Sequence, residues 1–352
     1  MYPSTLGYFS NPLLQKYQIA FLEKIQKIWE NHIDLDIPPD DFLLFPDHHA
    51  LLLTFIRPDI QEKELYLERL KKDFLLYKKS NNTLMLNKDE CILGTNIFLT
   101  LDFQNPDAHK STHPDHKKNQ VHIAFGDVLP NEWRNLFQKS FLILQSVSPG
   151  FMDEMNRVIR KIIPFGVSYQ VHNSGSYKDV IGHLLMSYPT GVDSPELSLL
   201  EAILHEYNHN KLNLILQTEK LILNDYTEKY YSPYRPDARH IHGIYLWVHA
   251  ITGAYWVILN AHTLWILTLD ESWKQKAILH VLKNGLALQV LDKYAVLTSL
   301  GKEILDEIRS VHRECLWFIK KMGISDEDRF FIKEELKKHH RDVQQNYPYV
   351  QS

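Results

Sequence analysis

The sequence predicts a mainly helical α+β protein in which a small sheet precedes one long apolar helix. Runs with apolar residues at helical spacing occupy both ends of the 352-residue chain. Short runs rich in β-branched and aromatic residues lie between these two helical parts. The last of the short runs is followed at once by a helix with a start signal. Strands grouped between helical stretches are typical of the α+β class.

The N-terminal part is expected to be helical first and to contain short strands later. Residues 13–29 predict a helix, because apolar side chains recur there at helical spacing. Its apolar face consists of Leu14, Tyr17, Phe21, Ile25 and Ile28. Residues 51–79 indicate one or two further helices, interrupted near Pro58. Two strands and a helix are expected next, over 97–103, 120–125 and 131–147.

The central part carries the strongest pattern. Residues 165–172 and 183–189 read as strands, and the segment NSGSYKD between them reads as a turn. Asp193 is then expected to cap a helix that runs to about Gln217. Four more helices should complete the chain, over 244–269, 274–293, 299–322 and 326–341. We divide the chain into a helical N-terminal region with short strands, 1–160, and a second region, 161–352, which could form one continuous domain with the first.

Composition narrows the function classes. The net charge is −4, so the basic excess typical of nucleic-acid binders is missing. Two cysteines, Cys91 and Cys315, exclude a disulfide scaffold and favour a reducing, cytoplasmic location. Residues 241–269 carry no Asp, Glu, Lys or Arg, but they include several His and Asn side chains that are costly in lipid. We therefore expect a buried helix there and no membrane span.

One motif carries chemistry. Residues 205–209 read His-Glu-Tyr-Asn-His, the H-E-x-x-H pattern, within an apolar helix. Histidines four residues apart lie on one face of a helix, so His205 and His209 could share one metal ion. Glu206 lies about 100° around the helix from His205, and could act as a base or orient another group. Three polar residues buried without a role would be costly, which favours a metal site.

The third ligand decides the class of enzyme. A metzincin peptidase needs Gly and His at the positions of Leu212 and Ile215, so that class is excluded. A zinc peptidase of the gluzincin type would take an acid such as Asp225 or Glu228, with Glu206 as general base. The other possibility is a third histidine downstream: His240, His242 or His249. Histidine ligands with open positions also suit non-haem iron and oxygen chemistry.

Two further segments resemble the HExxH-type iron(II)- and 2-oxoglutarate-dependent peptide β-hydroxylases, which modify ribosomally made peptides. The motif helix LSLLEAILHEYNHNKL is followed by a Ser-Pro-Tyr-Arg-Pro segment at 232–236 and by His-Gly-Ile-Tyr at 242–245. These resemble the elements that follow HExxH in that family, with Tyr234 in place of a Trp. The strand at 183–189 matches the strand before the family's motif helix. The resemblance covers roughly residues 165–260.

This resemblance implies a dioxygenase that hydroxylates a residue of a precursor peptide, its partner. His205, His209 and His242 would bind Fe(II), with His249 as the reserve third ligand. Arg235 or Arg239 would hold the far carboxylate of the co-substrate 2-oxoglutarate, since guanidinium matches a carboxylate with two parallel hydrogen bonds. Lys211 is the next cation available for that role.

Two alternatives from other classes stay open. The first is the zinc metallopeptidase described above, with zinc as its cofactor. The second is a metal-stabilised binding protein without catalytic activity. A histidine as third ligand favours iron, whereas an acid at Asp225 or Glu228 favours zinc. Absence of bound metal would favour the non-catalytic protein.

Overall fold

The computed structural model describes residues 11–60, 63–80, 89–100, 128–169, 173–323 and 325–347. The chain divides into two compact units. One unit, here called the sheet unit, contains Asn11–Phe141 and Met152–Thr218. The other, the bundle unit, contains Met1–Ser10, Leu142–Phe151 and Glu219–Ser352. The division falls just after the motif helix and groups that helix with the N-terminal elements.

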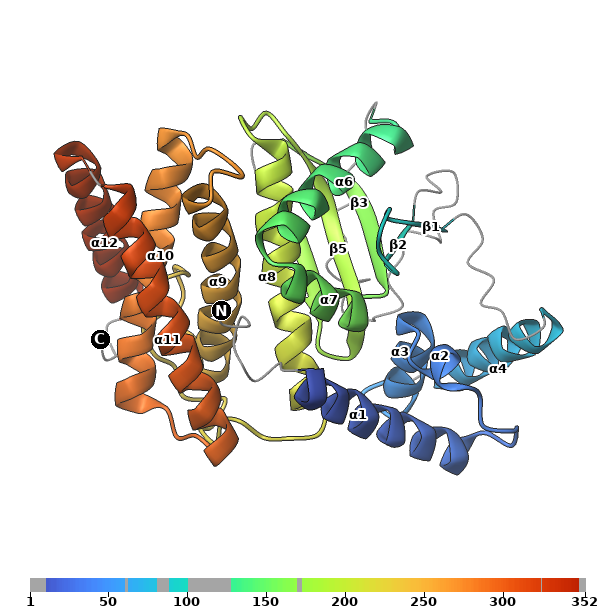
Figure 1. Cartoon of the computed structure of the whole chain (residues 1–352). Helices are drawn as coiled ribbons and strands as arrows, with labels where there is room; N and C mark the ends of the chain where they lie inside the picture. The colour runs from blue at the N-terminus through green and yellow to red at the C-terminus, as the bar shows by residue number, and fades with distance from the viewer. Residues whose placement is uncertain are drawn as a thin grey trace. The chain divides into compact units, whose positions relative to one another are not determined.

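The predicted fold class is confirmed, since the protein is mainly helical with one small sheet. Figure 1 shows this sheet beside α6, α7 and α8, the helices from the middle of the chain. The elements that belong wholly or partly to the sheet unit are α1 (Asn11–His32), α2 (Asp40–Leu43), α3 (Pro46–Phe55), α4 (Lys63–Lys79), β1 (Asp89–Cys91), β2 (Phe98–Thr100), α6 (Pro130–Val147), α7 (Pro149–Val158), β3 (Lys161–Tyr169), β4 (Ser174–Tyr177), β5 (Val180–Thr190) and α8 (Pro195–Leu216).

The expected N-terminal helices form. In α1, Leu14, Tyr17, Phe21 and Ile25 are buried, whereas Ile28 is only half-buried. Trp29 takes its place in the core, with an exposed fraction of 0%. The chain breaks after α3 at the expected proline and resumes as α4. The strand expected at 120–125 lies outside the described residues, and of 97–103 only the part up to Thr100 is described, as β2.

The described strands form a five-stranded sheet in the order β1-β2-β3-β5-β4. The pairs β2–β3 and β3–β5 are parallel, and β4 pairs antiparallel with β5 at one edge. Helix α8 packs against β5 and β4, so the motif helix lies beside the edge strand of the sheet. This contact positions the candidate site.

The turn predicted for NSGSYKD is wrong in part. Residues 174–177 form the edge strand β4, and the reversal is limited to Lys178 and Asp179 before β5 begins. Ser and Gly have low strand propensity, which hides an edge strand that is held by its neighbour. The N-cap of α8 also differs from the prediction. Ser194 occupies it, one residue after Asp193, and no side chain caps the helix.

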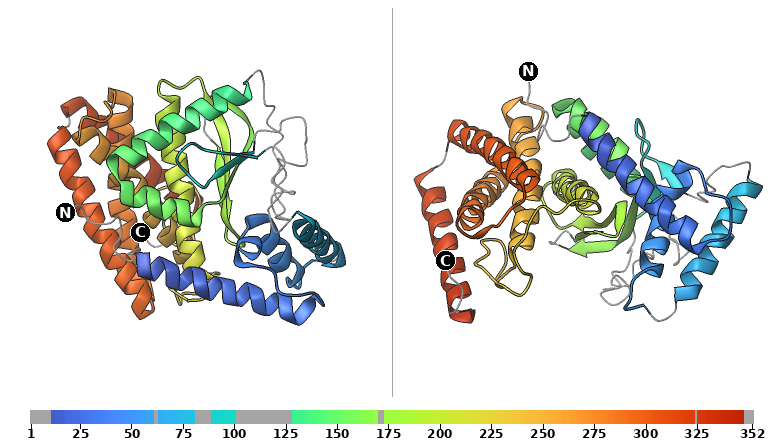
Figure 2. Two further views of the ribbon diagram at one scale, coloured as in Figure 1. Left: turned by 45° about the vertical axis from the view of Figure 1, so that its right-hand side comes forward. Right: turned by 90° about the horizontal axis from the view of Figure 1, so that it is seen from below.

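The bundle unit contains four long helices: α9 (Ile241–Thr263), α10 (Glu271–Tyr294), α11 (Ser299–Met322) and α12 (Asp326–Asn346). Figure 2 shows α9, α10 and α11 side by side, and α12 beside α10. The helix predicted over 244–269 begins earlier, at Ile241, and ends at Thr263. Two residues later, Trp265 adopts a positive φ of 61°. Asp270 then caps α10 by accepting a hydrogen bond from the backbone N–H of Trp273.

Helix α9 is long and apolar enough to cross a membrane. Its length is mostly buried in the protein, as in the core helix of a soluble protein. The fully buried side chains include Tyr245, Val248, His249 and Ala250. The hydroxyl of Tyr245 donates a hydrogen bond to the backbone carbonyl of Gly301 on α11, at 2.8 Å. The described residues therefore give no clear membrane span.

Candidate metal site on helix α8

Helix α8 is buried on all sides except along one narrow stripe. From Leu197 to Ile215 every residue is buried, apart from Glu201, His205 and His209. These three are half-buried and recur every four residues, so they share one face of the helix. The two histidines of the motif are thus the nitrogen ligands that this helix presents on its accessible face.

The two imidazole rings of this face meet. The Nε2 atoms of His205 and His209 lie 3.0 Å apart, and the ring planes are almost perpendicular. Two nitrogens that bind one ion at about 2.0–2.1 Å are about 3 Å apart when they occupy adjacent octahedral positions. The spacing of the pair therefore fits a single transition-metal ion.

The charge state of His209 also fits a metal. Burial, with a further contribution from the neighbouring His205, lowers the pKa of His209 to about 4. Glu206 opposes this shift. His209 is therefore neutral at physiological pH, and neutral imidazole is the form that binds metal ions.

Glu206 points to the sheet and is held there. Its exposed fraction is 6%, and each carboxylate oxygen accepts a hydrogen bond from a serine of β4. The Ser174 hydroxyl donates to Oε1 at 2.8 Å, and the Ser176 hydroxyl donates to Oε2 at 2.6 Å. Residues two apart in a strand face the same side, so the edge strand presents both hydroxyls to one carboxylate. Both serines lie in the segment that the sequence predicts as a turn, so their role was not predicted; their i, i+2 spacing was the available signal.

A buried amide fixes α8 on the sheet. The Asn210 Oδ1 accepts a hydrogen bond from the backbone N–H of Gly182 at 2.7 Å, and its Nδ2 donates to the carbonyls of His183 and Glu206. Gly182 has a φ of 87°, and a Cβ there would lie 2.7 Å from the carbonyl oxygen of Val158. Only glycine suits this position, and Asn210 ties the motif helix to it.

Lys211, the fallback cation for 2-oxoglutarate, is engaged elsewhere. Its Nζ forms an ion pair with the Glu154 Oε2 at 2.8 Å, and both side chains are buried. Burial raises the pKa of Glu154, and the attraction to Lys211 opposes that shift. Lys211 is therefore a structural cation of the sheet unit rather than a group directed at a ligand.

The remaining predicted site residues belong to the bundle unit. His242, in the first turn of α9, is half-buried and stacks on Tyr226 with ring centroids 3.8 Å apart. Burial lowers the pKa of His242, and a hydrogen bond with the Ile222 backbone opposes this. His240 caps the same helix by accepting from the Gly243 N–H at 2.9 Å. His249 lies two turns further along α9, with an exposed fraction of 0%.

The two predicted arginines share one acid. Arg239 pairs with Asp237 at 2.8 Å, and Arg235 lies 3.6 Å from the other oxygen of the same carboxylate. Their segment is closed by a backbone bridge between Tyr230 and Arg239. The three side chains are one-third to one-half exposed, and together they keep a net positive charge.

Tyr234 anchors this segment. Its ring stacks on Trp247 of α9 with centroids 5.0 Å apart. Its hydroxyl donates to the Asn284 Oδ1 at 2.5 Å, and burial raises its pKa well above the ordinary value. The Ser-Pro-Tyr-Arg-Pro segment is thus fixed to the bundle at its centre.

The two acids expected as the third ligand of a gluzincin, Asp225 and Glu228, form hydrogen bonds with neighbouring residues of their own loop. The Asp225 carboxylate accepts hydrogen bonds from the Thr227 N–H and hydroxyl, which lowers its pKa. Glu228 accepts a hydrogen bond from the Tyr230 hydroxyl at 2.6 Å. Both acids are exposed. Within the described residues of the sheet unit, no third His, Cys, Asp or Glu joins His205 and His209 in a metal-binding group.

Comparison with known proteins gives no match: no family model matches the chain, and no curated protein does. The interpretation of the site therefore depends on its own geometry and chemistry.

Proposed function

We propose that His205 and His209 hold one Fe(II) ion, and that the protein is a 2-oxoglutarate-dependent hydroxylase of a ribosomally made peptide. The observation that carries this proposal is the imidazole pair, 3.0 Å apart on the accessible stripe of an otherwise buried helix. Iron bound there, with O2 and 2-oxoglutarate, would supply the oxidation of a carbon–hydrogen bond.

The environment of Glu206 favours this reaction class over peptide hydrolysis. A peptidase needs this glutamate as a general base, within reach of a metal-bound water. Here both oxygens already accept hydrogen bonds from Ser174 and Ser176, and the side chain is buried. A carboxylate held in this way orients α8 and the histidines through the sheet. Its role in our proposal is positioning rather than proton transfer.

The co-substrate site and the third ligand would come from residues that follow α8 in the chain. Arg235 and Arg239 provide guanidinium groups for the far carboxylate of 2-oxoglutarate, with Asp237 between them. His242 would be the third protein ligand, with His249 in reserve. The His242 Nδ1 is buried and has no hydrogen-bond partner among the described residues, so this nitrogen is not already engaged.

The test begins without the peptide. The purified protein is loaded with Fe(II) under anaerobic conditions and titrated with 2-oxoglutarate, while the visible absorbance is followed. Admission of O2 should then give succinate in the absence of peptide, and His205→Ala should abolish both signals. Glu206→Gln should reduce turnover without eliminating it, because its role is structural.

Other outcomes would support the alternatives. Cleavage of a peptide with Zn(II), independent of 2-oxoglutarate and abolished by Glu206→Gln, would establish a peptidase instead. Failure to bind any divalent metal would leave the non-catalytic binding protein. Where a peptide substrate is in hand, a gain of one oxygen atom without cleavage, detected by mass spectrometry, is the expected product.

A further inference from the structure

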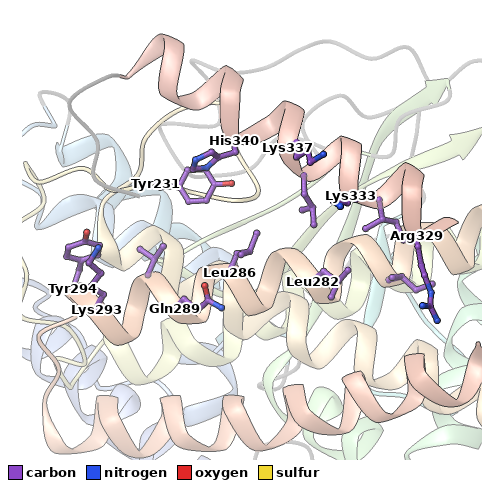
Figure 3. Close-up of a pocket in the computed structure, with 14 residues that line it drawn as sticks. Tyr231, Leu282, Leu286, Gln289, Lys293, Tyr294, Arg329, Lys333, Lys337 and His340 are labelled. Atoms are coloured by element: carbon purple, nitrogen blue, oxygen red, sulfur yellow. The ribbon is translucent and has the colours of Figure 1, made fainter. Parts of the chain in front are cut away.

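A groove of about 830 Å³ lies within the bundle unit, between α10 and α12 (Figure 3). Tyr231 and Tyr294 lie at one end, and the helices form the two long walls. The proposed hydroxylase reaction uses none of its residues. The inference drawn from it is therefore independent of the proposed function.

The floor of the groove is apolar. Leu282 and Leu286, one turn apart on α10, line the groove (Figure 3), and Ile332 and Leu336, at the same spacing on α12, line it as well. Leu282, Leu286 and Leu336 are only half-buried, so part of this apolar surface remains open. An open apolar surface rimmed by polar groups marks a binding site more often than an ordinary surface.

The rim of the groove is cationic. Arg329, Lys333 and Lys337 recur every four residues along α12, which places them about 6 Å apart in a row. Lys293 adds a cation from α10 at the other wall. Neither Asp nor Glu occurs among the described residues that line the groove. Lys337 pairs with Glu334 outside it at 2.8 Å, whereas Arg329 and Lys333 form no ion pair with any described residue.

We propose that this groove binds a short amphipathic helix whose apolar stripe is flanked by acidic residues. Acids every four residues on such a helix would match the row Arg329, Lys333 and Lys337. The wall from Ile278 to Lys293 is about 22 Å long, the length of about four helical turns.

The charge pattern favours this occupant over two others. A fatty acid carries a single anionic end, whereas the cations here run along the whole length of the groove. A second copy that docked through the same face would bring the row Arg329, Lys333 and Lys337 against itself. Like charges placed opposite each other oppose association.

The test uses the full chain and a fluorescein-labelled, Leu/Glu amphipathic peptide of about 15 residues, the length that spans the groove. Fluorescence polarisation should show saturable binding that weakens as salt is raised. Lys333→Glu should weaken binding by about tenfold or more, because it turns an attraction into a repulsion. Lys338→Glu is the matched control, since Lys338 is an exposed lysine of the same helix that does not line the groove. It should change the affinity less than twofold.

A second variant tests the apolar floor without a change of charge. Leu286→Gln alters a half-buried side chain, so the fold should tolerate it while peptide binding falls. Several results would overturn the proposal: no saturable binding, equal losses from Lys333→Glu and Lys338→Glu, or displacement of the peptide by oleate at lower concentrations than by unlabelled peptide. A dimer in light scattering that Lys333→Glu disperses would assign the groove to a second copy instead.

Discussion

The Nε2 atoms of His205 and His209 lie 3.0 Å apart, on the half-exposed stripe of a helix whose other faces are buried. From Leu197 to Ile215, every residue is buried except Glu201 and these two histidines. The two rings are therefore the accessible nitrogen ligands of this part of the helix. The serine-bound Glu206 and the clamp at Asn210 fix the helix against the sheet. The sheet therefore serves as a rigid support for a two-histidine site.

The hydroxyls of Ser174 and Ser176 should stabilise the sheet unit through Glu206. Replacing both serines by Ala leaves a buried carboxylate without its hydrogen bonds, at a cost of about 1–3 kcal/mol for each bond lost. Urea denaturation of the metal-free protein measures this loss. Ser80→Ala is the control, since the Ser80 hydroxyl only donates to the carbonyl of Leu76 at the surface. Equal losses in the control and the double variant would show that Glu206 does not depend on the serines.

The Lys211–Glu154 pair should be essential for stability because it is buried. Lys211→Met leaves the Glu154 carboxylate buried and unpaired, and we expect a loss of about 3–5 kcal/mol in the free energy of unfolding. Adding Glu154→Gln should recover a large part of the loss, since the second change removes the uncompensated charge. A double-mutant cycle measured by denaturation decides this. Simple addition of two large losses would contradict the interpretation.

Histidine 49 should make the stability of the protein depend on pH. Burial lowers its pKa to about 4, whereas a histidine in the unfolded chain titrates near about 6.5. Between these two values the unfolded state binds the extra proton, so stability falls as the pH decreases from about 6.5 to about 4. One pKa unit corresponds to about 1.4 kcal/mol, so the contribution of His49 is at most about 3.5 kcal/mol.

His49→Leu tests this dependence. As the pH falls from about 6.5 to about 4.5, the free energy of unfolding should decrease less in the variant than in the wild type. His32→Leu, at the exposed end of α1, serves as the control. Denaturation curves that shift equally in the wild type and His49→Leu would assign the acid sensitivity to other groups, such as His312, whose pKa burial also lowers to about 4.

Arg235, Asp237 and Arg239 should control the affinity for 2-oxoglutarate. Arg239→Leu removes a charge-assisted contact worth about 1.5–3 kcal/mol, which weakens binding by about ten- to a hundredfold. Asp237→Asn should act in the opposite direction, because Asp237 pairs with both guanidinium groups and would compete with the proposed co-substrate for them. Titration of the Fe(II)-loaded protein with 2-oxoglutarate measures both. Unchanged affinity in Arg239→Leu, Arg235→Leu and Asp237→Asn would place the carboxylate site elsewhere.

The sequence alone predicted the fold class and the placement of His205 and His209 on one face of a single helix, because both depend on local periodicity. The apolar pattern of α8 and the i, i+4 spacing of His205 and His209 are properties of a single helix. Several polar residues buried in that helix make specific contacts, among them Glu206, Asn210 and Lys211. Asn210, for example, bridges two strand backbone groups that are distant in sequence.

The features that the sequence did not predict depend on tertiary contacts. The strand β4 is held by pairing with β5, and its Ser and Gly residues have no strand preference of their own. The carboxylate of Glu206 is held by two serines of that strand. Because the strand was not predicted, these serines could not be identified from the sequence. The pairing of Lys211 with Glu154 joins residues 57 positions apart in the chain, and no local pattern reports such a contact.

The stoichiometry of Fe(II) in histidine variants tests the central claim most directly. The protein is prepared without chelator and loaded under anaerobic conditions, and bound iron is measured by elemental analysis in the wild type, His205→Ala, His209→Ala and the control His32→Ala. We expect one Fe(II) per chain in the wild type and in His32→Ala, and none retained in His205→Ala or His209→Ala. Full iron occupancy in either of these two variants would contradict the account, because the metal would then be bound without the pair on α8.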